Sequence, residues 1–183
     1  MSDLRYFGTD YFKMPNDLIA GIYNDVATNT KKIKYIPLNN VKEVYPSCGV
    51  ENFPAETNPY AIGTSQYEVL NNRDSSMFNC DNTTLKGWGS NRLGELGLGQ
   101  NIKYINSIVN IPIDFKEVKK VFRTKSCRYL YNDSTCFYGT IFIMKDGTVK
   151  GCGTNLYGYE GTAQYSIVDL DLTNVKDIFY TNK

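Results

Sequence analysis

Residues 78–97 read FNCDNTTLKGWGSNRLGELG, and residues 142–161 read FIMKDGTVKGCGTNLYGYEG. The two stretches align without a gap at a spacing of 64 residues and share a pattern that we call the glycine motif. Internal repetition of this kind predicts an array of similar small units. The aligned positions are Gly87, Trp88, Gly89, Asn91, Gly94 and Gly97 in the first copy and Gly151, Cys152, Gly153, Asn155, Gly158 and Gly161 in the second.

A shorter pattern, V-K-x-[VI]-[FY], alternates with the glycine motif, and we call it the V-K motif. It occurs at residues 41–45, 118–122 and 175–179, and a decayed third glycine motif, LRYFGTD, occupies residues 4–10. Trp88 aligns with Phe7 and Cys152, and a position that accepts these three residues is expected to be a core site rather than a ligand platform. The alternation predicts one repeat domain that begins on one half-unit and ends on the other. Its predicted parts are a half-unit 1–13, a unit 36–99 with an insertion loop 47–72, a unit 111–161 and a half-unit 167–183.

The local chemistry favours β-structure. Asp146-Gly147 lies between two apolar alternating stretches and is the pair that a two-residue type I′ hairpin turn prefers. The glycine motif supplies residues for positive φ and for close backbone approach, and the V-K motifs are expected to be strands. Residues 15–26 (PNDLIAGIYNDV) are compatible with one short helix, and residues 60–63 and 67–70 with strands inside the insertion loop.

The composition excludes several chemistries. Among 183 residues there is no histidine, which removes Ser-His-Asp catalysis and imidazole metal sites. The formal net charge of +1 provides no electrostatic footprint for nucleic acid, so no nucleic-acid partner is expected. The five cysteines form no C-x-x-C pair and are expected to be buried or semi-buried thiols in a reducing setting. Cys127 and Cys136 flank a polar turn, and both a disulfide and two free thiols stay open there.

The chain contains neither a secretion signal nor an apolar run of the roughly 20 residues that a membrane span needs. We therefore expect synthesis in the cytoplasm without a signal peptide, and no membrane insertion. The abundance of Asn, Lys, Ile and Tyr is typical of low-GC bacteria and their phages.

Residues 85–99, LKGWGSNRLGELGLG, resemble the repeats of the regulator of chromosome condensation family, and residues 145–149 match the acidic turn that precedes them there. The resemblance implies an all-β fold of propeller-like repeats, in which each blade is a small antiparallel sheet. It also implies protein–protein interaction through loops and blade faces. The family's G-x-x-H-T stretch is absent, and motif spacings of 81 and 64 residues exceed the roughly 40–50 of typical propeller repeats.

The sequence predicts two complete blades plus two half-blades, fewer than the roughly 4–8 blades of a closed propeller. Three arrangements account for that number: a piece of a longer array, an open capped structure, or half-blades completed by another chain. Head-to-tail pairing would provide three blades for each chain, so that a dimer closes a six-bladed ring.

The high number of tyrosines is the strongest indication of a recognition surface in the composition, because tyrosine combines a large contact area with a polar tip. The alternative is burial at sheet edges together with codon bias. A basic residue recurs at one strand position, as Arg5, Lys86 and Lys150. These residues either lie on a solvated strand face or form a basic row that binds a partner. The candidate interaction surface comprises Tyr129, Tyr131, Tyr138, Tyr157, Tyr159 and Tyr165.

Carboxylates are the remaining candidates for chemistry. Asp169 and Asp171 are expected on one strand face, and Glu95 and Glu160 follow the glycine motif. A glycosidase needs two carboxylates held at a set separation around a cleft, which strand spacing does not establish. No catalytic residue, cofactor or metal is therefore expected.

We expect a non-catalytic recognition or assembly protein, a structural or adhesive component of a bacterial surface or of a phage tail or virion. Its expected partners are other proteins and further copies of itself, with a cell-surface glycan as a further candidate. The alternatives are a proteinaceous enzyme inhibitor or another protein-binding propeller module, and, more weakly, a glycan-active enzyme.

Overall fold

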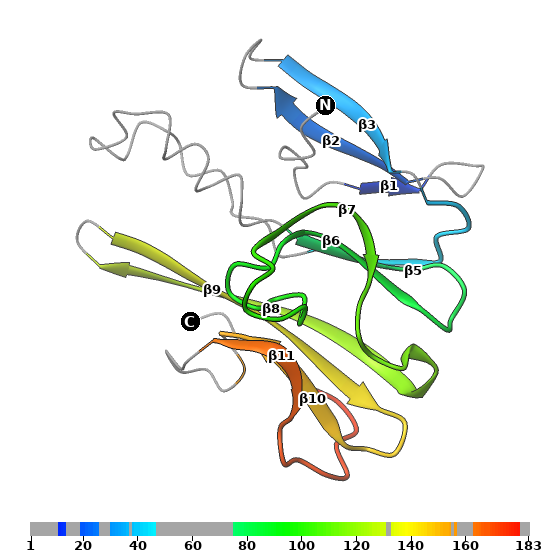
Figure 1. Ribbon diagram of the computed structural model, residues 1–183, viewed down its shortest axis with the longest axis vertical. Coiled ribbons are helices and arrows are strands. Elements are labelled where there is room, and N and C mark those ends of the chain that lie inside the picture. The colour runs from blue at the N-terminus through cyan, green and yellow to red at the C-terminus, as the bar shows by residue number, and fades with distance from the viewer. Residues whose placement is uncertain are drawn as a thin grey trace.

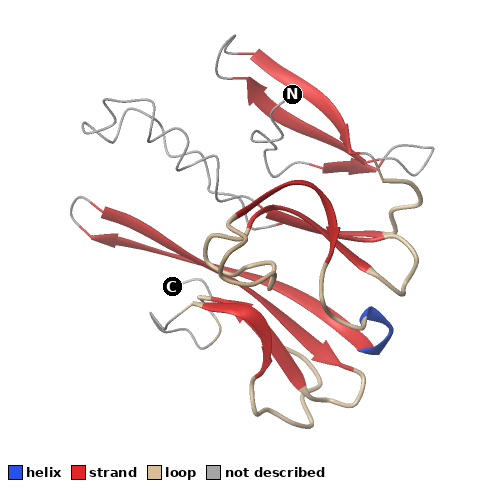
Figure 2. Cartoon of the chain, in the orientation of Figure 1, coloured by secondary structure: helices blue, strands red, loops and turns tan. Residues whose placement is uncertain are grey.

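The computed structural model describes residues 11–13, 19–25, 30–36, 38–46, 75–130, 133–154, 156 and 163–179. Within them the chain is all-β, as expected: three antiparallel sheets contain every strand (Figure 2). The one helix among these residues is the 3₁₀ turn η3 (Phe115–Glu117). No described helix is long or apolar enough to cross a membrane.

The N-terminal sheet has the order β1-β2-β3, with β1 at Tyr11–Lys13, β2 at Ile19–Asp25 and β3 at Thr30–Ile36. The helix predicted over residues 15–26 is wrong where the structure describes it, because residues 19–25 form β2. All seven residues of β2 pair with β3. Gly21 at the centre weakens a helix by about 1 kcal/mol relative to alanine, and pairing with a neighbouring strand outweighs local helix propensity here.

Two four-stranded antiparallel sheets follow, with the orders β4-β5-β6-β7 and β11-β10-β9-β8. Figure 1 shows the three sheets following one another along the long axis of the molecule. The first comprises β4 (Glu43–Pro46), β5 (Ser75–Asn79), β6 (Leu85–Ser90) and β7 (Tyr104–Asn110). The second comprises β8 (Val118–Leu130), β9 (Asp133–Met144), β10 (Val149–Gly153) and β11 (Gln164–Asp169).

Each four-stranded sheet starts at a V-K motif and ends with a strand that follows the glycine motif. The fourth strands, β7 and β11, lie beyond residues 99 and 161, where the predicted units end, and the repeat pattern did not indicate them. The glycine motif at residues 4–10 and the insertion loop 47–72 with its two predicted strands lie outside the described residues.

The predicted hairpin between β9 and β10 is confirmed, but its turn differs from the predicted type I′. Met144 N–H donates to Thr148 O at 2.9 Å and Gly147 N–H donates to Met144 O at 3.0 Å, so the loop has three residues, 145–147. Gly147 has a φ of 85°, whereas Asp146 has no positive φ, which type I′ requires. Asp146 Oδ1 instead accepts from Thr148 N–H at 2.9 Å and so favours the longer loop.

The two G-x-G sequences create the same β-bulge in both sheets. The register shifts between Gly87 and Gly89 where β6 pairs with β7, and between Gly151 and Gly153 where β10 pairs with β11. Gly89 and Gly153 have φ values of 100° and 102°, a conformation that residues with a Cβ rarely adopt. The expected positive φ is therefore confirmed at these positions.

Asp81 caps the turn between β5 and β6, and we expect it to make the protein less stable in acid. Its Oδ1 accepts from Thr83 N–H and Thr84 N–H, both at 2.8 Å, and these bonds lower the pKa of Asp81 to about 2. The unfolded value is about 3.9, so this stabilisation is present above about pH 4 and is lost as the pH falls toward 2.

Asp81→Asn is the matched variant, because the amide oxygen still accepts both bonds and does not titrate. We expect its melting temperature to fall less steeply than that of the natural protein between pH 5 and pH 2. Parallel curves for the two proteins would contradict this role for Asp81.

Candidate interaction surfaces

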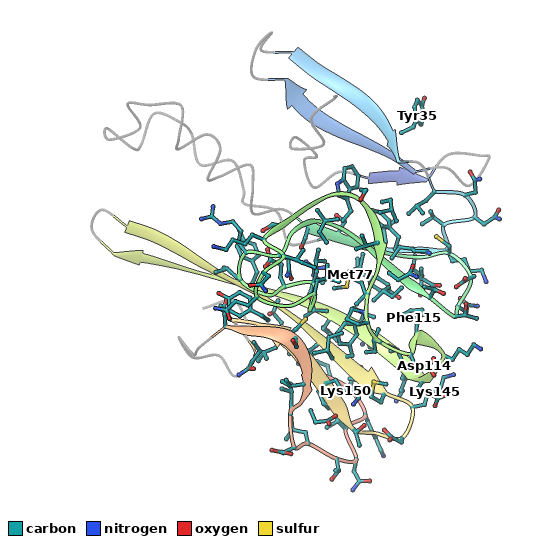
Figure 3. The ribbon with its side chains drawn as sticks, viewed as in Figure 1. Tyr35, Met77, Asp114, Phe115, Lys145 and Lys150 are labelled. Carbon is teal, nitrogen blue, oxygen red and sulfur yellow. The ribbon has the colours of Figure 1, made fainter. Side chains whose placement is uncertain are left out.

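The main core cluster joins the two four-stranded sheets. Met77 and Phe115 lie within it, between the sheets (Figure 3). Both sheets therefore stack face to face through close-packed apolar side chains. The buried members of the cluster are Met77, Leu85, Leu96, Ile105, Ile111, Phe115, Val118, Val121, Phe142, Met144 and Cys152.

Residues aligned by the repeat occupy the same place in successive interfaces. Leu85 of the first sheet faces the second sheet, and its counterpart Val149 lies in the cluster on the far face of the second sheet. Phe78 and Trp88 belong to the cluster on the opposite face of the first sheet, as expected for a core tryptophan. Their counterparts Phe142 and Cys152 face the first sheet. Each four-stranded sheet thus has one face directed toward the preceding unit and the other directed toward the following unit.

The connections between units repeat as well. Ile111 N–H donates to Leu85 O at 2.8 Å, and Leu170 N–H donates to Val149 O at 2.9 Å. A Cβ on Gly87 would meet the side chain of Ile111, and a Cβ on Gly151 would meet that of Leu170. The motif glycines therefore make room for the apolar residue that leads into the next V-K motif.

The V-K motifs show where this repetition stops. Their first residues, Val41, Val118 and Val175, each pack toward the preceding side of their unit. Their last residues are aromatic and face the following unit: Tyr45 packs into the cluster between the sheets, and Phe122 into the next cluster. The third, Phe179, is 89% exposed.

The third V-K motif lies against the second sheet but forms no strand, so its expected strand structure is wrong. Val175 N–H donates to Gly147 O at 3.0 Å. Lys120 Nζ lies 2.7 Å from Asp177 Oδ1, and Lys119 Nζ donates to Lys176 O at 3.2 Å. The segment runs beside the V-K motif of β8, and no described strand pairs with it.

A second exposed feature is the end of the β8–β9 ribbon, which we call the arm: residues 125–130 of β8 and 133–138 of β9. β10 pairs with β9 only from Gly139 to Ile143, so the arm extends past the third strand. Figure 1 shows it projecting away from the rest of the molecule.

The predicted tyrosine surface needs one correction. Tyr138 is 1% exposed, because it lies on β9 among the buried residues at the root of the arm, and it is therefore no part of an exposed surface. Tyr165 is half-buried on β11, where its carbonyl accepts from Gly99 N–H at 2.8 Å. Tyr129 is on the arm opposite Ser134. Tyr131, Tyr157 and Tyr159 lie outside the described residues.

The lysines of the recurring strand position bond to the fourth strand. Lys86 Nζ donates to Asn110 Oδ1 at 2.6 Å, and Lys150 Nζ donates to Asp169 Oδ1 at 2.7 Å. These equivalent contacts tie β6 to β7 and β10 to β11, and both lie at the surface. Arg5 lies outside the described residues.

The carboxylates are not arranged as the sequence suggested. Asp171 follows the end of β11 with a φ of 52°, so it does not share a strand face with Asp169. Glu95 is 1% exposed; its Oε2 accepts from Leu93 N–H at 2.8 Å and its carbonyl from Thr140 Oγ1 at 2.6 Å. Glu160 lies outside the described residues. In the described part of the chain, no three acidic or cysteine residues cluster as metal ligands.

Asn91 organises the first glycine motif. Its amide Nδ2 donates to Ile102 O at 2.7 Å and to Gly99 O at 3.2 Å, and its Oδ1 accepts from Leu96 N–H at 2.9 Å. The loop also packs on the second sheet, where Leu98 bridges to Ser166. Asn155, Gly158 and Gly161 of the second copy lie outside the described residues.

Comparison of the chain with models of known protein families finds no match, and comparison with curated proteins finds none either.

Proposed function

We propose that this chain is a non-catalytic assembly protein whose propeller-like blades are completed by a second copy of the same chain. The observation that carries the proposal is the exposure of Phe179. Tyr45 and Phe122, at the same motif position, pack into inter-sheet clusters, whereas Phe179 is 89% exposed. A large exposed aromatic at a position built for packing marks an interaction surface.

The far face of the second sheet extends the interface already present between the sheets. It is covered by Leu170, Val175 and Ile178, the counterparts of Ile111, Val118 and Val121. At the interface between the two four-stranded sheets, Ile111, Val118 and Val121 pack together with residues from other strands of the second sheet. A second copy that adds such strands on the far face, and a further sheet after them, would bury Phe179.

Among the described residues, the N-terminal sheet lacks the strand that the third V-K motif could provide. As described it has three strands, and β3 leads to a V-K motif just as β7 and β11 do. The third V-K motif of a second copy would add a fourth strand, beside β1. Edge strands with unpaired backbone groups favour such pairing.

Two chains joined in this way have six sheets, within the range of about 4–8 that propellers use. The interface is used twice about a twofold axis, so the assembly closes. The resemblance of the glycine motif to regulator of chromosome condensation repeats supports the same interpretation. For such an assembly we propose a recognition role on a bacterial surface or in a phage tail or virion.

Light scattering of the purified chain over a range of concentrations tests the proposal. We expect a dimer. We expect Phe179→Ser to weaken each interface about thirtyfold, because burying a phenylalanine side chain contributes about 2 kcal/mol, and therefore to weaken the dimer, which uses the interface twice, about a thousandfold. The matched control is Ile102→Ser, which removes another exposed apolar side chain at a position outside the V-K motifs. It should leave the dissociation constant unchanged.

A strict monomer at high concentration would contradict the proposal, as would equal effects of the two variants. The cellular role has its own readout: a structural component is present in fixed stoichiometry in a larger assembly, whereas an inhibitor binds one soluble enzyme.

A further inference from the structure

The arm places two cysteines opposite each other. In the β8–β9 pairing Cys127 is the direct partner of Cys136, between the pairs Ser126–Phe137 and Arg128–Thr135. Directly opposed residues of antiparallel strands have Cα atoms about 4.5–5.5 Å apart. Disulfides span Cα separations of about 4.4–6.8 Å, so this register meets the backbone requirement.

The arm also has a physical need for a cross-link. Beyond Gly139 no described strand pairs with β9 on its other side, and the arm is a two-stranded ribbon. Two-stranded ribbons are marginally stable in water on their own. A bond between opposed residues holds such a ribbon in one register.

We propose that Cys127 and Cys136 form a disulfide that locks the arm in register. A small-molecule disulfide such as oxidised glutathione is the oxidant. One thiolate attacks it, releasing one small thiol and leaving a mixed disulfide; the second thiolate then attacks the protein sulfur of that bond and releases the other small thiol. Two S–H bonds are replaced by one S–S bond, and both protons and both electrons leave with the reduced oxidant.

The two cysteines whose side chains are described are poor competitors. Burial raises the pKa of the Cys152 thiol to about 12, and burial also raises the pKa of Cys80. Both are free thiols. Because the thiolate is the reactive form, neither attacks a disulfide readily at neutral pH.

Tryptic mapping tests the bond in the full chain. Trypsin cleaves after Lys125 and Arg128, which puts Cys127 on the peptide 126–128 and Cys136 on the peptide 129–145. The protein is equilibrated with oxidised glutathione, unfolded, alkylated without reduction, and digested. We expect the two peptides to be joined, with a mass two hydrogens below their sum, and to separate when a reductant is added.

Cys136→Ser should abolish the joined species, and Cys80→Ser should retain it. Amide exchange of the arm should be at least tenfold slower in the oxidised than in the reduced natural protein, because the bond suppresses local opening. Separate alkylated peptides after oxidation, or Cys127 joined to any other cysteine, would overturn the disulfide. Equal exchange in the two forms would overturn its role as a lock.

Discussion

Gly153→Ala is expected to lower the free energy of unfolding by about 4 kcal/mol, the largest effect of any substitution proposed for this protein. Gly153 has a φ of 102°, and a Cβ there would lie 2.3 Å from Tyr138 O and 2.7 Å from Gly139 Cα. Both atoms belong to the backbone of β9, which pairs with β10, so neither can move without breaking the sheet. Denaturant unfolding measures the loss.

Gly99→Ala separates the two causes. Gly99 has a similar φ of 92°, but a Cβ at that position meets nothing within 4 Å. Alanine there carries only the backbone strain, about 1–2 kcal/mol. Similar losses for the two variants would show that the backbone of β9 yields to the methyl group, contrary to the packing argument.

Asn91→Ala is expected to lower the free energy of unfolding by about 3 kcal/mol, because one buried and two part-buried hydrogen bonds are lost. Asn91 and Leu96 are both fully buried, so the Leu96 N–H that bonds Asn91 Oδ1 has no access to water after the change. The carbonyls of Gly99 and Ile102 lose their donor as well. The loop of the first glycine motif should therefore open, and thermal or denaturant unfolding reports the loss.

Asn110→Ala is the control for this substitution. Asn110 is exposed and accepts one bond from Lys86, so its replacement should change stability by about 0.5 kcal/mol or less. A loss at Asn91 no larger than the loss at Asn110 would show that the side chain does not hold the loop.

Much of the fold followed from short-range pattern. The hairpin at Asp146-Gly147 and the positive φ of Gly89 depend on a few neighbouring residues, and both were predictable. The repeat also predicted that Trp88 is a core residue, because Phe and Cys occupy the same place in the other copies. Even here the turn had three residues, since the Asp146 bond to Thr148 decided between two loop lengths.

The incorrect predictions concern features that are set by contacts between segments distant in the sequence. Residues 19–25 form a strand because β3 pairs with them, and β3 is a separate segment. Tyr138 is buried by its place in the second sheet, although the abundance of tyrosine suggested that it belongs to an exposed interaction surface. The fourth strands β7 and β11 lie outside the predicted units, although both contain Ser-Ile-Val followed by Asn or Asp (residues 107–110 and 166–169), and their pairing with β6 and β10 identifies them.

The same distinction between local pattern and long-range contact applies to the candidate surfaces. The sequence alone contained the repeated units, the glycines that need positive φ and the absence of histidine chemistry, because each of these depends on residue type and local spacing. Pairing and burial required the folded chain: the exposure of Phe179, in contrast to the partly buried Phe122 and Tyr45, and the opposition of Cys127 to Cys136. Both follow from which segments lie side by side, and that is set by the summed packing of the sheets rather than by any one stretch of residues.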